Sequence, residues 1–174
     1  MFLFTRLSSN YFWYFGVLGL VVPFMAVLLD AKQFSSQDIG EIIAIFTASK
    51  ILGPSLWATL ADKTGQQVSI IRLGTVLATL SFSALYWLES FWPITICLAL
   101  FSFFWSAVLP QLEVMTLNSI RRDNKIYARI RLWGSIGFIV FVMIGGEVIE
   151  RWLASGFISL ALISLVILCI STLL

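Results

Sequence analysis

One carboxylate and one guanidinium stand out in a chain whose side chains are mostly apolar. Glu113 lies inside one apolar run, and Arg131 follows it by 18 positions at the start of the next. If the two runs are antiparallel helices joined by a short connection, Glu113 lies about three residues further from that connection, roughly 4–5 Å along the helix axis. A long arginine side chain spans that difference, so the spacing predicts a charge-assisted pair across the helix interface. Such a pair can accept hydrogen bonds from a polar solute and donate hydrogen bonds to it.

Arg129 offers an alternative interpretation of the same stretch. Arg129 and Arg131 are two positions apart, so their side chains point about 200° apart around a helix and only one of them can face Glu113. The spacing favours Arg131. The alternative is that both arginines anchor the end of the helix beside the basic stretch 118–125, as positive residues on the inner side of a membrane do.

Lys50 is a second charge that needs an explanation, because it lies near the middle of the apolar run 40–60, shortly before Gly53 and Pro54. A lysine at the centre of a bilayer costs about 2.5–3.5 kcal/mol on insertion scales, so it should face a cavity or a partner. Two interpretations remain open. Lys50 attracts a substrate or counter-ion, or it forms a structural pair or extends toward the membrane surface.

The rest of the composition indicates a membrane protein that spans the bilayer several times. Of 174 residues, 60% are hydrophobic and 11% are charged, which is far too little polar surface for a soluble domain. The chain contains no histidine, and its two cysteines lie inside apolar runs, so we expect no metal site, disulfide or cofactor. The net charge of +2 is spread along the chain without a basic run of the kind that nucleic-acid binders carry, which argues against nucleic-acid binding. An enzyme is disfavoured because no distinctive serine motif accompanies Lys50.

The elements that must position these charges are membrane-spanning helices. Six apolar runs are close to the roughly 20 residues that a span requires, and lipid leaves the backbone no partner outside a helix. We predict helices over 10–29, 40–60, 70–88, 93–117, 130–149 and 156–174. If the N-terminus is cytoplasmic, all lysines and arginines except Lys32, Lys50 and Arg151 fall in the inner segments. This asymmetry predicts that both termini are cytoplasmic.

The turn after the second run carries the first resemblance to a known family. Asp62, Lys63 and Gly65 alone fit a tight turn on the positive, inner side of the membrane. The turn also resembles the loop between the second and third helices of the major facilitator superfamily, although Ala58 replaces the leading glycine and Gln66 and Gln67 replace the closing basic pair. In that family the loop braces a gate between two helix bundles. The resemblance therefore implies a conformational role for Asp62, Lys63 and Gly65.

A second block is similar to the lactose permease group of oligosaccharide/proton symporters and to the phenylpropionate permease group of the same superfamily. The similarity rests on the interval between Glu113 and Arg131 together with Pro110, Arg129, Gly134, Gly137 and Phe138. It implies that Glu113 and Arg131 bind the solute and that Phe138 stacks on it, where the sugar symporters have a tryptophan. A basic residue in the region of Lys50 is a feature of the phenylpropionate group, which favours an aromatic acid over a neutral sugar.

The resemblance implies an all-α fold, with six transmembrane helices arranged as two inverted three-helix repeats that form the N-terminal half of a major facilitator transporter. The implied function is proton-coupled symport of a small organic solute, an aromatic acid or a sugar- or nucleoside-like compound, by alternating access in the bacterial inner membrane. Because the resemblance covers half of that fold, a C-terminal half, a second copy or a partner is also implied. The alternative is a six-helix membrane module that transports nothing and acts as a structural or regulatory partner.

Overall fold

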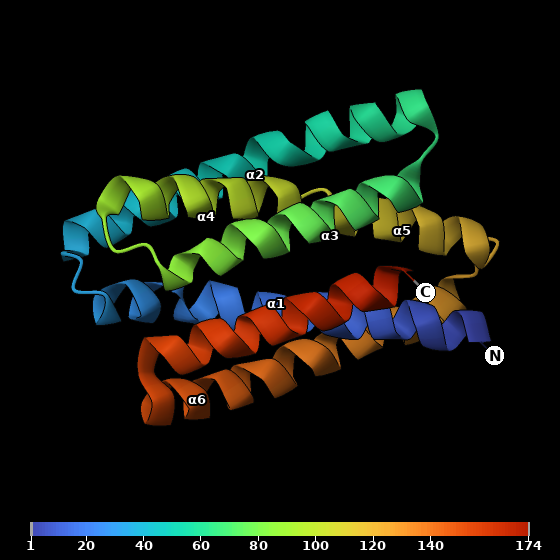
Figure 1. The fold of residues 1–174 in the computed structure, drawn as a ribbon. Helices are drawn as coiled ribbons and strands as arrows, with labels where there is room; N and C mark the ends of the chain where they lie inside the picture. Colours follow the sequence, from blue (N-terminus) through green and yellow to red (C-terminus); the bar gives the residue numbers. More distant parts are fainter. Residues whose placement is uncertain (1, 174) are drawn as a thin grey trace.

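The computed structural model describes residues 2–173, with the side chains of residues 2, 153, 154 and 173 excepted. The chain forms a bundle of helices that run back and forth along one common direction (Figure 1). The elements are α1 (Phe2–Ala31), α2 (Ser36–Thr64), α3 (Gln67–Ser83), the 3-10 helix η1 (Ala84–Tyr86), α4 (Phe91–Trp105), α5 (Val108–Ser119) and α6 (Asn124–Leu173).

Six segments of the described chain are long and apolar enough to cross a membrane, which confirms the predicted all-helical fold with six spans. They are Leu3–Ala31, Ser36–Thr64, Gln67–Tyr86, Phe91–Ser119, Asn124–Trp152 and Ser155–Thr172. The fourth span combines α4 and α5, whereas α6 turns back on itself and contributes the fifth span and the sixth, coloured orange and red in Figure 1. Most helices extend beyond the predicted ranges, because their polar end residues are helical without being apolar.

The spans pack in a pattern that two related three-helix repeats explain. The first span contacts both the fifth, through Gly137, and the sixth, through Phe157. The fourth span contacts both the second and the third, because α4 packs against α2 and α3. If the first, second and third spans are exchanged for the fourth, fifth and sixth, the contacts of the first span become those of the fourth. Since each repeat contains an odd number of spans, the second repeat enters the membrane in the opposite direction.

Pro110 divides the fourth span into two helices. Proline lacks an N–H, and its ring obstructs the carbonyl group four residues earlier, which here belongs to Ser106. The helix is interrupted between Trp105 and Val108, and the Ser106 hydroxyl donates a hydrogen bond to the Phe103 carbonyl at 2.6 Å. The span predicted over 93–117 is present as Phe91–Ser119, with this break inside it. The short helix α5, which carries Glu113, begins after the break.

Short polar turns set where α2 begins and ends. Ser35 and Asp38 form a capping box, in which each side chain accepts a hydrogen bond of 3.2 Å from the backbone N–H of the other. At the other end Gly65 adopts a φ of +66° and donates its N–H to the Ala61 carbonyl at 2.8 Å, a conformation that favours glycine. The turn predicted at Asp62–Gly65 is thus present in the structure.

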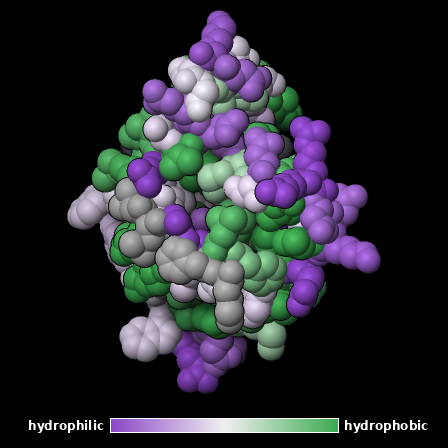
Figure 2. All heavy atoms as spheres, turned by 90° about the vertical axis from the view of Figure 1, so that its right-hand side faces the viewer, coloured by the Kyte–Doolittle hydropathy of each residue, from purple (hydrophilic) through white to green (hydrophobic). Residues whose placement is uncertain are grey.

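The α2–α3 and α5–α6 loops lie at one end of the bundle, where Figure 1 also marks both chain termini. Figure 2 views this end directly and shows hydrophilic side chains around apolar ones. Its exposed basic residues include Lys63, Arg121, Arg122 and Lys125. We call it the basic end.

The interior of the bundle is built from aliphatic and aromatic side chains, among which Tyr11, Phe82, Phe101 and Phe157 are almost completely buried.

Candidate functional site

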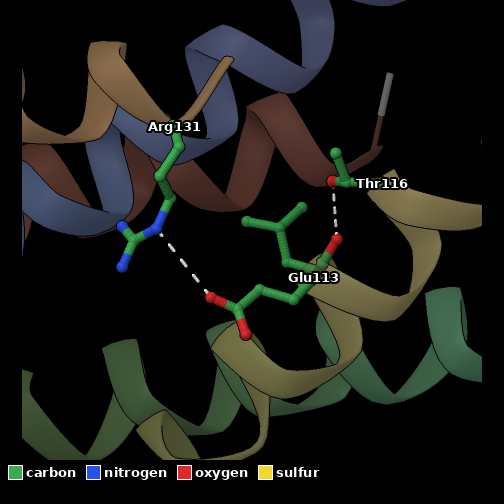
Figure 3. A network of polar contacts seen from close by, with 4 residues as sticks. Glu113, Thr116 and Arg131 are labelled. Carbon is green, nitrogen blue, oxygen red and sulfur yellow. Dashed lines mark hydrogen bonds and ion pairs between the residues drawn. The ribbon is translucent and has the colours of Figure 1, made fainter. Parts of the chain in front are cut away.

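Glu113 of α5 and Arg131 of α6 lie opposite each other and form an ion pair (Figure 3). Arg131 Nε and Glu113 Oε1 are 3.9 Å apart, and each side chain is 36% exposed. The pair predicted from the 18-residue spacing is therefore formed. Because 3.9 Å is too long for a hydrogen bond, both groups keep hydrogen-bonding capacity for a third molecule.

Two aromatic rings of α1 support the guanidinium group of Arg131. Its Cζ atom lies 4.1 Å from the centre of the Phe15 ring and 5.7 Å from that of Tyr11. Both distances are within the range of cation–π attraction. Neither ring was predicted to lie at the site. The signal that could have identified them is the four-residue spacing that places Tyr11 and Phe15 on one helix face.

Thr116, one turn beyond Glu113, does not compete for its carboxylate. The Thr116 hydroxyl is buried and donates to the Leu112 carbonyl at 2.6 Å, as Figure 3 shows. Within residues 2–173, Arg131 is the basic side chain at ion-pair distance from Glu113. The carboxylate therefore has one charged partner and further lone pairs for a solute.

A cavity of about 270 Å³ is lined by residues of the first, second and fourth spans, and neither Glu113 nor Arg131 is among the described residues of its wall. Its wall includes Tyr14, which is next to Phe15 in the chain, and Pro110, one turn before Glu113. The rings of Tyr14 and Trp105 are parallel, with their centres 4.4 Å apart. The cavity thus offers flat aromatic surface, as sites for small organic molecules commonly do.

Lys50 of α2 lines this same cavity and also a second one of about 150 Å³. Its Nζ atom is 4.6 Å from the centre of the Phe46 ring, and the residue is half-buried. Among the side chains that the structure describes, no carboxylate lies within 4 Å of Lys50. The structural ion pair left open by the sequence is therefore not formed there. Lys50 faces cavities, as a cation at mid-membrane depth should.

Phe138 lies on the same side of α6 as Arg131 but two turns further along. Seven residues separate them, which is about 10 Å along the axis and about 20° around it. The residue is half-buried, and its backbone carbonyl packs against Gly19 of α1. The structure therefore places Phe138 in line with the pair, beyond the reach of a direct contact with Arg131.

Asp62, Lys63 and Gly65 are exposed at the basic end, where α2 stops. They do not belong to the cavity or to the ion pair. Lys63 in the last turn is favoured by the negative end of the helix dipole, whereas Asp62 in that turn is disfavoured by it. Asp62 therefore gains no stabilisation from the dipole of α2.

Comparisons with known proteins show what the chain is similar to. The MFS_1 like family matches residues 4–174. The chain is 31% identical to a maltose permease of Geobacillus stearothermophilus over 138 residues. This aligned stretch covers 78% of this chain and 35% of the permease. The chain is also 24% identical to a probable 3-phenylpropionic acid transporter of Escherichia coli K12 over 148 residues. This stretch covers 84% of this chain and 38% of that protein. The aligned chain thus spans little more than a third of these relatives.

The fold also resembles a solved structure. The nucleoside transporter NupG superposes with a TM-score of 0.87 over 99% of this chain and 44% of its own, at 18% sequence identity. At that identity the likeness concerns the fold alone. It confirms that the six helices have the arrangement of one half of a larger transporter.

Proposed function

Since the chain belongs to the MFS_1 like family of the major facilitator superfamily, we propose that it is the N-terminal half of a proton-coupled secondary transporter for a small organic solute. The observation that carries this proposal is the pair Glu113–Arg131, half-exposed within a bundle of membrane spans. Ionisable side chains inside membrane spans are rare and mark substrate or proton pathways. The basic end would face the cytoplasm.

Glu113 and Arg131 have complementary parts in this proposal. The carboxylate accepts hydrogen bonds from the solute, and the guanidinium group donates to it while Tyr11 and Phe15 hold its position. Phe138 stacks on a solute long enough to reach two turns further along α6. A second six-helix unit, from the same polypeptide or another, closes over the pair, and alternating access follows from the two units rocking around it.

Transport under an imposed gradient tests the function itself. The protein with its complete coding sequence would be reconstituted in vesicles, and uptake of labelled 3-phenylpropionate and maltose would be measured with and without an inward proton gradient. We expect uptake that a protonophore abolishes. Uptake that is indifferent to the gradient would exclude proton coupling, and no uptake of any solute would favour the structural or regulatory module.

We propose further that the solute carries a carboxylate beside a flat ring. Lys50 supplies the positive charge, and the stacked pair Tyr14–Trp105 supplies the aromatic wall of the same cavity. The names of the two relatives suggest different solutes, a sugar and an aromatic acid. Lys50, without a carboxylate within 4 Å among the described residues, favours the acid.

Lys50→Gln should remove this preference. The loss of one charge-assisted hydrogen bond costs about 1.5–3 kcal/mol, so we expect the apparent affinity for 3-phenylpropionate to fall at least about tenfold. Competition of unlabelled acids against labelled solute measures the change. Lys125→Gln, which removes an equal charge at the exposed basic end, should leave affinity unaltered. Equal affinities in wild type and Lys50→Gln would refute the carboxylate proposal.

Asp62, with Lys63 and Gly65, is proposed to brace the gate and not to bind solute. Asp62→Asn should therefore reduce the maximal uptake rate severalfold while KM stays constant, because the change affects conformational exchange and not the solute contacts. Asp30→Asn, at the exposed end of α1, is the matched control. A raised KM at an unchanged maximal rate would contradict the gate assignment.

A further inference from the structure

A groove of about 260 Å³ lies between α1 and the fifth span, near the basic end. Its lining includes Thr5, Ser8, Ser9 and Phe12 of α1 and Trp133 of α6. The four residues of α1 follow the spacing of one helix face. Three hydroxyl groups therefore lie at the outer part of the groove, and two aromatic rings lie further along it.

Ser8 has a hydroxyl group that the protein leaves unused. Its side chain is 6% exposed, and its buried Oγ atom has no hydrogen-bond partner among the residues described. A serine inside a helix usually donates to the carbonyl four residues earlier. A buried hydroxyl group without an acceptor is unfavourable. A molecule bound in the groove would supply the acceptor that Ser8 lacks.

Arg129 places a positive charge beside the groove. It lies one helical turn before Trp133 and thus on the same side of α6, and its side chain is exposed. Within the described part of the chain it forms no ion pair. Arg121 and Arg122, exposed in the preceding loop, add to the positive field at this end.

The groove faces away from the Glu113–Arg131 site. Trp133 follows Arg131 by two positions, so the two side chains point about 200° apart around the helix. A second unit closing over the ion pair would leave Trp133, which is 44% exposed, in contact with lipid. Thr5, Ser8 and Ser9 lie in the first two turns of the span Leu3–Ala31, at the depth where lipid headgroups meet the hydrocarbon.

We propose that this groove binds one anionic phospholipid. Arg129 and the Ser8 hydroxyl donate hydrogen bonds to the phosphate, and one acyl chain lies along Phe12 and Trp133. The charge, the unused donor and the two rings are arranged in the order in which a phospholipid presents phosphate and hydrocarbon. This site goes beyond the proposed transport function and does not depend on it.

Native mass spectrometry of the purified protein in neutral detergent tests the proposal, with phosphatidylglycerol and phosphatidylcholine of identical chains offered in competition. Wild type should retain phosphatidylglycerol severalfold more than phosphatidylcholine. Arg129→Gln and, independently, Ser8→Val should remove that preference. Lys125→Gln and Ser55→Val, exposed residues outside the groove, should keep it.

Three outcomes would overturn the proposal. If wild type retained the two lipids equally, no headgroup would be recognised. If Lys125→Gln lowered retention as much as Arg129→Gln, only the general positive field would act. If inorganic phosphate at millimolar concentration displaced the lipid completely, the site would be one for free phosphate.

Discussion

Solute uptake is expected to fall about 10- to 100-fold in Arg131→Gln and in Glu113→Gln. Each change removes a charged partner of the solute, and charge-assisted hydrogen bonds contribute about 1.5–3 kcal/mol each. Both side chains are 36% exposed, so the charge left behind remains hydrated and the protein should still fold. Initial rates in vesicles, normalised to the amount of inserted protein, measure the effect.

Matched controls separate the role of the pair from a general effect of charge. Glu150→Gln and Lys125→Gln neutralise exposed residues near the two ends of the bundle and should transport normally. The double variant Glu113→Gln/Arg131→Gln restores charge balance, so its melting temperature should approach that of wild type while uptake stays low. If the double variant transported normally, the pair would be a structural feature only.

Gly137→Ala is expected to have the largest effect on stability. A Cβ atom at Gly137 would lie 2.9 Å from the Phe12 carbonyl carbon and collide with the backbone of α1, which cannot move aside as a flexible side chain can. Overpacking of this kind costs about 1–3 kcal/mol or more. For a chain of this size each kcal/mol lowers the melting temperature by about 2–4 °C. The melting temperature in detergent should therefore fall by several degrees.

Gly40→Ala is the matched control, because a Cβ atom there would meet nothing within 4 Å. Gly40 is exposed in the first turns of α2, where alanine favours the helix by up to about 1 kcal/mol. Its melting temperature should stay constant or rise slightly. Equal losses in Gly137→Ala and Gly40→Ala would mean that the close approach of α1 and α6 does not limit stability.

The six spans and the Glu113–Arg131 pair could be predicted from the sequence because both follow from the number of residues in short stretches of the chain. Apolar length determines whether a helix can cross a bilayer, and the spacing across a short connection determines which side chains of two antiparallel helices meet. The position of Lys50 beside cavities was predictable for a similar reason, since a charge at mid-membrane depth should face a cavity or a partner. These features need no knowledge of how distant helices pack.

The features that were missed depend on packing between distant segments. Tyr11 and Phe15 support Arg131 only because α1 lies against α6, and the wall formed by Tyr14 and Trp105 joins the first span to the fourth. Pro110 was recognised inside the fourth span, but the break in the helix near Ser106 was not predicted. The role of Phe138 in stacking on a solute stays a prediction, because no contact in the structure tests it.

Equilibrium binding to the purified protein tests the central claim most directly, since it detects the solute site without requiring transport. Titration with labelled 3-phenylpropionate or maltose should give saturable binding in wild type and in Asp62→Asn, and binding weakened at least about tenfold in Arg131→Gln. Undiminished affinity in Arg131→Gln and Glu113→Gln would contradict the claim that this pair forms the solute site.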